Sequence, residues 1–167
     1  WLLVDIGNSF IKCADGERNG AMGPISHCNF ASVLQNIPNY AGVYVSSVGH
    51  EDYLHELALC CQRHDIVFIQ PDKRSIAHGV TFAYEDISTL GVDRWVNIIA
   101  AHHYAKGDVL VISLGTAITC DFVASTGQHL GGWIAPGLTL SAKALLSNTA
   151  NIRAKVTEPI EIEFGVS

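Results

Sequence analysis

The sequence predicts an α/β protein whose two halves repeat the same order of elements. In each half, three consecutive segments typical of β-strands are followed by a segment typical of a helix. The connections between the strands are short, which favours a layered α/β domain. Both halves also place a glycine and a hydroxyl residue in their first turn. We interpret this pattern as a weak internal duplication with an interface between the halves.

The first half begins with an apolar strand over residues 1–6, which stops at the turn signal Gly7-Asn8. A second strand over residues 10–14 follows, so residues 5–12 read as a hairpin. The remaining predicted elements are a weaker strand (25–28), a helix (30–37) ended by Pro38, a strand (41–48), a helix (51–63) and a strand (66–69) ended by Pro71. Residues 71–90 are expected to be largely loop.

The second half repeats the outline from Gly91 onward. Its predicted elements are a helix (93–104), strands over 109–114, 117–123 and 128–134, a turn at Pro136-Gly137 and a helix (138–146). The chain begins without a methionine and ends at Ser167 with nothing that resembles a C-terminal cap. We therefore expect a C-terminal segment to be missing, through truncation or disorder.

Composition narrows the class of protein. The chain has 167 residues, of which 49% are hydrophobic and 16% charged, so a sizeable core is available. The formal net charge of −6 argues against a nucleic-acid partner, which would require a basic face. No apolar run approaches the roughly 18 residues needed to cross a bilayer, and no signal peptide precedes Trp1. We expect a soluble, cytoplasmic protein with no membrane partner.

The cysteines and histidines do not indicate a metal site. The five cysteines are odd in number and form no C-x-x-C, so we predict buried or half-buried free thiols in a reducing compartment. His50-Glu51 looks like the start of H-E-x-x-H, but the second histidine, His55, lies five residues after the first and leaves its helical face. His102 and His103 are adjacent and cannot both point at one metal. Surface or packing histidines are the simpler interpretation.

The first candidate site is the hairpin from Asp5 to Lys12. Gly7 allows close backbone approach, and backbone N–H groups in such a turn can bind phosphate oxygens. Asp5 could hold a hydrated Mg²⁺, and Lys12 could reach a terminal phosphate. The full candidate set is Asp5, Ile6, Gly7, Asn8, Ser9, Phe10, Ile11 and Lys12. A plain hairpin with a polar turn remains the alternative.

The second candidate site, from Ser113 to Asp121, repeats the strand–glycine–hydroxyl–strand layout. Two such turns facing each other across a cleft could hold the two ends of one triphosphate. Thr116 lies at the turn itself, and Thr119 is assigned to the same face of the hairpin. A threonine-rich β-hairpin without a ligand is the alternative.

Two further segments are candidates. At the predicted start of a helix, Asp93 and Arg94 could supply a base for an acceptor hydroxyl and a guanidinium for an acidic substrate. They could equally be a helix-start acid and a surface ion pair. In the segment 131–137, glycines and a proline shape a tight bend, for which a structural role is at least as good an interpretation as ligand contact.

Four motifs together resemble one family. They are D-x-G-N-S-x-x-K at 5–12, G-x-D-R at 91–94, G-T-A-x-T-x-D at 115–121 and G-G-x-I-x-P-G at 131–137. Each motif alone is weak, but their order and spacing are similar to those of type III pantothenate kinases. The segments 45–48 and 147–150 also resemble that family. The resemblance runs from about residue 1 to about residue 155.

The resemblance implies a fold of two ribonuclease-H-like domains of the actin-like ATPase type. Residues 1–106 would be the N-terminal domain, and residues 107–167 would be the start of an incomplete C-terminal domain. It also implies ATP-dependent phosphorylation of pantothenate, the first step of coenzyme A synthesis. Members of the family are homodimers in which the partner subunit contributes substrate contacts.

The resemblance also assigns residues. Residues 5–12 would bind ATP, with Mg²⁺ at Asp5, and Thr116 would bind an ATP phosphate. The pantothenate-binding residues would be Tyr84, Gly91, Val92, Asp93 and Arg94. Asp93 would be the proton acceptor, and Arg94 would help to hold the anionic end of pantothenate.

This chain departs from the family at a few positions. Ser113 stands where the family usually has an aspartate that helps to bind a potassium ion, or ammonium in its place. Serine keeps an oxygen but loses the charge, which puts the cation dependence or the activity in question. A pantothenate-contacting threonine would follow near Ser167, and Ser9 replaces a threonine but keeps the hydroxyl. A weakly catalytic relative acting as a binding or regulatory protein, and a kinase for another small hydroxy acid, are the rival readings.

Overall fold

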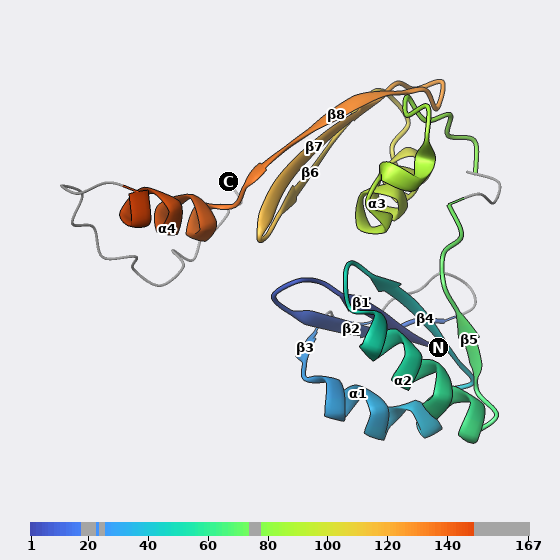
Figure 1. Ribbon diagram of the computed structural model, residues 1–167. Coiled ribbons are helices and arrows are strands. Elements are labelled where there is room, and N and C mark those ends of the chain that lie inside the picture. Colours follow the sequence, from blue (N-terminus) through green and yellow to red (C-terminus); the bar gives the residue numbers. More distant parts are fainter. Residues whose placement is uncertain (18–22, 24–25, 74–77, 149–167) are drawn as a thin grey trace, which may run out of the picture.

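The computed structural model of the protein describes residues 1–17, 23, 26–73 and 78–148. Two β-sheets form its framework (Figure 1). The first has the strand order β3-β2-β1-β4-β5 and the second the order β6-β7-β8. The order of three strands and a helix occurs twice, as β1-β2-β3-α1 and β6-β7-β8-α4, which confirms the repeated pattern expected from the sequence.

The first sheet combines a hairpin with parallel strands. Its members are β1 (Leu2–Ile6), β2 (Ile11–Asp15), β3 (Ser26–Cys28), β4 (Gly42–Ser47) and β5 (Val67–Ile69). β1 pairs antiparallel with β2 and parallel with β4, so β1 lies at the centre of the sheet. The apolar alternation along β1 sends Leu2, Val4 and Ile6 to one buried face.

Helices α1 (Phe30–Asn36) and α2 (Glu51–Arg63) cover that buried face (Figure 1). Asn29 caps α1, because its side-chain oxygen accepts a hydrogen bond from the Ser32 N–H at 2.8 Å. The helical spacing of α2 buries Leu57, Cys60 and Cys61 against the strands. This core fixes the sheet, and the opposite face of β1 and β2 remains for Asp5 and Lys12.

The second sheet is an antiparallel meander of β6 (Val109–Leu114), β7 (Ala117–Val123) and β8 (His129–Pro136). Helix α3 (Val92–Tyr104) packs on one face, where Trp95 and Ile98 are buried with Val123, Val80 and Leu90. The opposite face carries exposed apolar side chains: Leu110, Ile112, Leu114, Phe122, Leu130 and Trp133. α3 therefore lies between the second sheet and the first, which it contacts at β4 (Figure 1).

Most predicted boundaries hold within one or two residues. The helix 51–63 and the strands 109–114 and 117–123 are confirmed residue for residue. The predicted helix 30–37 ends earlier, and residues Ile37–Asn39 form a 3-10 turn because Pro38 cannot continue the hydrogen-bond ladder. In the described part of the loop 71–90, residues Ile87–Thr89 form a 3-10 turn capped by Asp86. Helix α4 (Leu138–Asn148) runs two residues beyond its predicted end at Leu146.

Two predictions require correction. Pro136 belongs to β8 and pairs with Ala117, so the predicted turn at Pro136-Gly137 starts one residue later. β8 is an edge strand, where a proline without an N–H is tolerated. The free-thiol prediction is wrong for Cys13 and Cys28, which form a disulfide between β2 and β3. It holds for the remaining three cysteines, Cys60, Cys61 and Cys120.

The core of the second sheet includes residues that precede it in the chain. Phe82, Tyr84 and Ile87 pack with α3 against the second sheet. The segment 80–104 thus shares a core with β6 and β7, and the predicted boundary between residues 106 and 107 stays a prediction. Residues 149 and 150 of the family-like segment 147–150 lie outside the described residues. None of the described helices is long and apolar enough to span a membrane.

Candidate active site at the junction of the two sheets

The turn between β1 and β2 is the first part of the candidate site. Ile6 ends β1, Ile11 begins β2, and the Gly7 N–H donates to the Phe10 carbonyl at 3.0 Å. Asn8, Ser9 and Phe10 are exposed at the tip of this turn. Ile6 and Ile11 are buried in the core of the first sheet, so only their backbones face the turn. A ligand at this turn would therefore meet backbone groups and the three exposed side chains.

The corresponding turn of the second sheet meets the first one. The Ser9 Oγ and the Thr116 Oγ1 lie 2.6 Å apart, although the two residues are 107 positions apart in the sequence. The Gly115 N–H donates to the Ala117 carbonyl two residues on, whereas the Gly7 N–H in the first turn donates to the Phe10 carbonyl three residues on. The two glycine–hydroxyl turns thus face each other as expected, but their hydroxyls are in direct contact rather than across a cleft. The hydroxyl groups of Ser9, from the first sheet, and Thr116, from the second, therefore lie at one point.

Asp5 lies beside this junction, at the end of β1. It is the register partner of Lys12, and the Lys12 Nζ is 3.9 Å from the Asp5 Oδ2. Burial raises the pKa of the Asp5 carboxyl, the Lys12 charge opposes that rise, and the nearby negative charge of Asp93 adds to it. The structure thus brings together two carboxylates and a lysine predicted from three separate positions of the sequence.

Asp93 reaches this position because it lies in the first turn of α3, after the Gly91 N-cap. The helix N-terminus stabilises a negative charge there. Val92 begins the helix, and both Gly91 and Val92 are half-buried. The segment 91–94 therefore points its acid toward the first sheet, while its basic residue, Arg94, turns toward the second.

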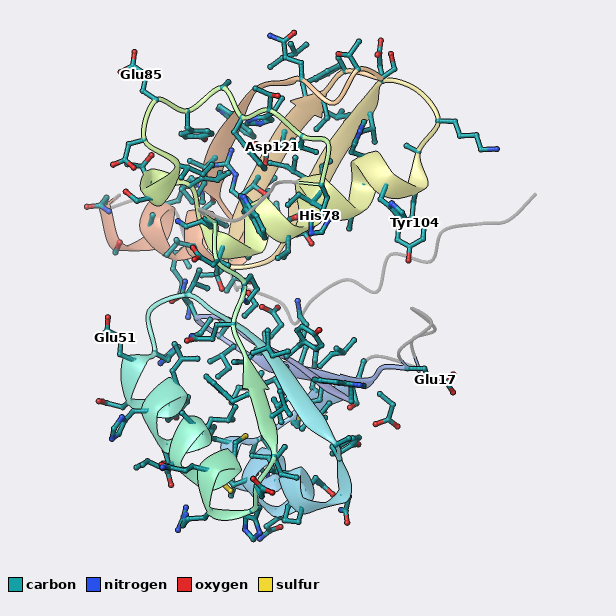
Figure 2. All side chains as sticks on the ribbon, turned by 90° about the vertical axis from the view of Figure 1, so that its right-hand side faces the viewer. Glu17, Glu51, His78, Glu85, Tyr104 and Asp121 are labelled. Carbon is teal, nitrogen blue, oxygen red and sulfur yellow. A yellow bond between two sulfur atoms is a disulfide. The ribbon has the colours of Figure 1, made fainter. Side chains whose placement is uncertain are left out.

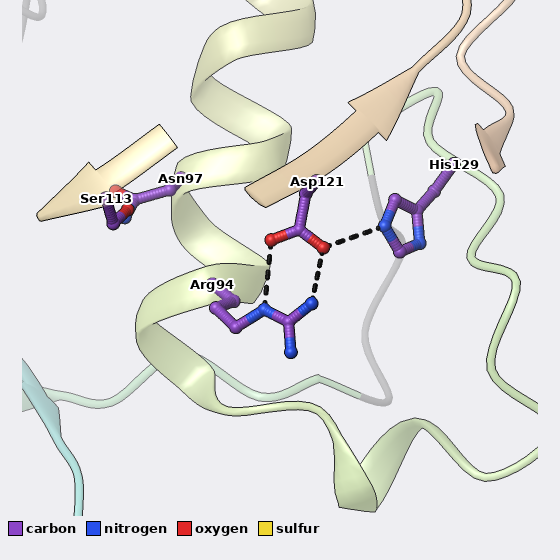
Figure 3. Close-up of polar contacts among 5 residues, drawn as sticks. All are labelled: Arg94, Asn97, Ser113, Asp121 and His129. Atoms are coloured by element: carbon purple, nitrogen blue, oxygen red, sulfur yellow. Dashed lines mark hydrogen bonds and ion pairs between the residues drawn. The ribbon is translucent and has the colours of Figure 1, made fainter. Parts of the chain in front are cut away.

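Arg94 forms a two-point ion pair with Asp121 of β7 (Figure 3). The Arg94 Nε donates to the Asp121 Oδ2 at 2.9 Å, and the Arg94 Nη2 donates to the Asp121 Oδ1 at 2.6 Å. Asp121 is 2% exposed and lies inside the half formed by the second sheet (Figure 2). The hydrogen bond to Asp121 is the main reason that the pKa of Arg94 is raised. The sequence left open whether Arg94 forms a surface ion pair or binds a substrate. Because the Arg94–Asp121 pair is buried, it is not a simple surface ion pair.

Ser113, the predicted potassium position, accepts a hydrogen bond from the Asn97 Nδ2 at 3.2 Å (Figure 3). Asn97 follows Arg94 by three residues on α3, so both side chains face the second sheet. Tyr84 lies close to Arg94, whose Cζ is 6.0 Å from the centroid of the Tyr84 ring. The structure thus groups Tyr84 and Arg94, two of the residues assigned to pantothenate.

The sequence patterns missed several polar residues of this region. In the sequence, Asp121 stands out only as the last residue of the 115–121 motif, and neither His129 nor Asn97 belongs to any of the motifs. The buried hydroxyls of Ser46 and Ser47 have no hydrogen-bond partner among the described residues, and the two serines are the register partners of Asp5 and Ile6. Their place beside the central strand could have been suspected from the polar ending of an apolar strand. No sequence signal marks His129.

The segment 131–137 has a structural role that the geometry explains. A side chain at Gly137 would overlap with the Gly115 carbonyl, so Gly137 allows the start of α4 to approach the Gly115-Thr116 turn. A side chain at Gly132 would overlap with the Asp121 Oδ1 and the Arg94 Nη2. Gly132 therefore leaves the space that the ion pair occupies.

Comparison with known proteins identifies the family. The type III pantothenate kinase family model matches residues 1–166. The chain belongs to the type III pantothenate kinase family. It is 52% identical to a type III pantothenate kinase of Marinomonas sp. strain MWYL1, over 97% of this chain and 66% of that protein. It is 38% identical to one of Pseudoalteromonas atlantica, over 98% of this chain and 69% of that protein.

A solved structure is similar as well. The crystal structure of a conserved Baf family protein from Campylobacter jejuni is 25% identical and matches with a TM-score of 0.60. The match covers 92% of this chain and 63% of that one. The chain thus spans about two thirds of the length of the relatives that it matches.

The close approach at Gly132 gives a test of the buried ion pair. Gly132→Ala should lower the free energy of unfolding by about 1–3 kcal/mol, because the added methyl group forces the Arg94–Asp121 pair to move. Gly107→Ala is the matched control, since no atom lies within 4 Å of its added carbon. It should change the stability by less than about 0.5 kcal/mol. Chemical denaturation measures both, and equal effects of the two substitutions would contradict the crowding at Gly132.

Proposed function

We propose that this chain, as part of a type III pantothenate kinase, transfers the γ-phosphoryl group of ATP to pantothenate, the first step of coenzyme A synthesis. The observation that carries the proposal is the junction at which Ser9 and Thr116 meet beside Asp5 and Asp93. At this junction, two glycine–hydroxyl turns of the kind proposed to bind phosphate lie beside two carboxylates, in a member of this kinase family.

The proposed reaction is an in-line displacement. The primary hydroxyl oxygen of pantothenate forms a bond to the γ-phosphorus of ATP, the bond from that phosphorus to the bridging oxygen breaks, and ADP leaves. Asp93 accepts the proton of the hydroxyl group. Because such a transition state requires little covalent chemistry from the protein, catalysis depends on positioning and on charge neutralisation. Residues 5–12 and Thr116 would hold the phosphates, with Lys12 as a point charge.

The residues present are compatible with a magnesium ion at Asp5. Burial raises the pKa of Asp5 and the charge of Asp93 adds to the rise, although the Lys12 charge opposes it, so a divalent cation would relieve the remaining cost of this half-buried carboxylate. Mg²⁺ typically takes one or two protein carboxylates and keeps several waters. When bound, Mg²⁺ supplies neutralisation of the phosphate charge. Asp5 is the residue that would hold it.

Tyr84 and the segment 91–94 would bind pantothenate. Asp121 takes the Nε hydrogen and one of the two Nη2 hydrogens of Arg94, so both Nη1 hydrogens and the second Nη2 hydrogen are left to contact the anionic end of the substrate. Arg94 would therefore contact pantothenate through the outer side of its guanidinium, where Nη1 and Nη2 can each donate one hydrogen.

Further parts of the proposal follow the family. They are a fold of two ribonuclease-H-like domains divided between residues 106 and 107, a homodimer and a cytoplasmic location. A monovalent cation, K⁺ or NH₄⁺, would lie near Ser113. The neutral Asn97–Ser113 hydrogen bond favours the second candidate function, a catalytically weak relative that binds the same ligands.

Removal of the proton acceptor tests the proposed function directly. The wild-type protein should consume ATP only when pantothenate is present, and Asp93→Asn should lower kcat by about 10²–10⁴. ATP binding should change little, because Asp93 accepts a proton from the other substrate. Coupled measurement of ADP release, with ATP affinity by calorimetry, reports both. ATP consumption that does not depend on pantothenate, or near-wild-type turnover of the variant, would refute the proposal.

Asp5→Asn should weaken the binding of Mg·ATP but not the binding of pantothenate. The variant removes the charge proposed to hold Mg²⁺, so binding of Mg·ATP should fall by tenfold or more, on the order of one charge-assisted contact. Pantothenate binding should stay within about twofold of the wild type. Titration calorimetry with each ligand alone gives both affinities. Equal losses for both ligands would indicate misfolding rather than a metal site.

Ser113 allows a test of the monovalent cation. A neutral hydroxyl offers a cation only a dipole, so the natural protein should respond weakly to potassium, whereas Ser113→Asp should create or sharpen the response. Steady-state kinetics in sodium and potassium buffers of equal ionic strength measure the difference. Ser113→Ala is the matched control, because it removes the oxygen without adding a charge. Strong potassium activation of the natural serine form would overturn this expectation.

A further inference from the structure

His129 is a buried polar residue that the proposed mechanism does not use. It begins β8 on the face of the second sheet that α3 covers, and it is 1% exposed. Its Nε2 lies 3.0 Å from the Asp121 Oδ1 (Figure 3). A buried histidine in such a place needs a physical reason, because burying its polar nitrogens is costly unless they form hydrogen bonds.

The hydrogen-bond geometry around Asp121 determines which nitrogen of His129 carries the proton. Asp121 is paired with a guanidinium, so it is a carboxylate and can only accept hydrogen bonds. The His129 Nε2 must therefore be the donor. The Nδ1 has no partner among the described residues, so a proton there would be an unpaired buried donor. The neutral ring protonated at Nε2 is the form that fits.

His129 also supports a second side chain. Its ring stacks on the ring of Tyr84, with 5.8 Å between the centroids and 5° between the planes. Phe82 lies across another side of the same ring at 5.6 Å. Tyr84 is therefore held from behind by His129, and the Arg94 guanidinium lies 6.0 Å from the centroid of the Tyr84 ring.

The two supported side chains, Tyr84 and Arg94, are among the five residues that the family resemblance assigns to pantothenate. We propose that His129 is a positioning residue for pantothenate binding, which fixes Arg94 through the Asp121 carboxylate and Tyr84 through ring stacking. The inference rests on the proposed function. His129 itself would not touch the substrate, since its side chain is fully buried. Its N–H keeps the Asp121 carboxylate oriented, so that the Arg94 Nη1 is directed away from Asp121 (Figure 3).

Two substitutions separate the hydrogen bond of His129 from its ring stacking. His129→Phe keeps an aromatic ring against Tyr84 and loses the N–H to Asp121, whereas His129→Gln keeps an N–H donor and loses the ring. Each should raise the KM for pantothenate by about five- to tenfold, on the scale of one hydrogen bond to a charged group or one ring contact. The kcat and the KM for ATP should stay within about twofold, because no ATP contact changes.

Val123→Ala is the matched control for a merely structural effect. Val123 is fully buried in the same core, but it has no polar contact with the Arg94–Asp121 pair. It should lower the melting temperature and leave the KM for pantothenate unchanged. Variants of His129 that lower the melting temperature without a selective rise in that KM, or that raise the KM for both substrates equally, would overturn the positioning role.

A spectroscopic measurement tests the proton arrangement without reference to activity. Nitrogen-15 NMR of the histidine-labelled full chain should show His129 as the tautomer with its proton on Nε2. A proton on Nδ1 alone would overturn the proposed link to Asp121. A wild type without pantothenate kinase activity would overturn the proposed function, and the positioning role with it. An active wild type with unselective His129 variants overturns the positioning role alone.

Discussion

The two-point ion pair between Arg94 and Asp121 joins α3 to the second sheet, and the location of Asp93 depends on it. A buried pair of this kind repays the loss of hydration only when geometry is good and the remaining lone pairs are satisfied. The geometry is good and most of the lone pairs are used, because both Asp121 oxygens accept from Arg94 and one also accepts from His129. Removal of one partner would leave an unpaired charge in the core. The pair therefore sets the direction of α3, and with it the side on which the adjacent acid faces the first sheet.

Charges at the junction of the sheets are arranged in the opposite manner. Burial raises the pKa of the Asp5 carboxyl, the Lys12 charge at 3.9 Å opposes that rise without cancelling it, and the nearby negative charge of Asp93 adds to it. A neutralised ion pair supports the fold inside the second half, whereas a partly buried carboxyl with a raised pKa lies where the ligands are proposed to bind. This division between a satisfied interior and an unsatisfied junction is typical of a site that gains its missing charge from a substrate or a metal.

The sequence predicted those features that depend on short-range signals. Turn residues located both hairpins, Gly7-Asn8 in the first and Gly115-Thr116 in the second, and helical spacing located α2 to the residue. The matched glycine–hydroxyl layout also predicted that the two turns face each other, but not that Ser9 and Thr116 are in direct contact. The family motifs carried the remaining site residues, whose roles stay predictions.

Long-range contacts were not predictable from such signals. Asp121 and Arg94 are 27 residues apart, and nothing in either motif indicates that they pair rather than bind a ligand separately. The Cys13–Cys28 bond was missed because cysteine spacing does not reveal which strands lie together. His129 looks like any other histidine in the sequence, and only the packing of β8 against Tyr84 gives it a role.

The strand order has a consequence for how the protein folds. The second sheet is a meander of hairpins, so each of its pairings closes a short loop. In the first sheet, β1 pairs in parallel with β4, although β2, β3 and α1 lie between these two strands in the sequence. Their pairing therefore closes a much longer loop. The chain loses the entropy of closing this loop before the contacts between the two strands stabilise it. The pairing of β1 with β4 should therefore limit the folding rate. Destabilising substitutions at the contact of β1 with β4 should therefore slow folding. Destabilising substitutions within the meander should mainly increase the unfolding rate.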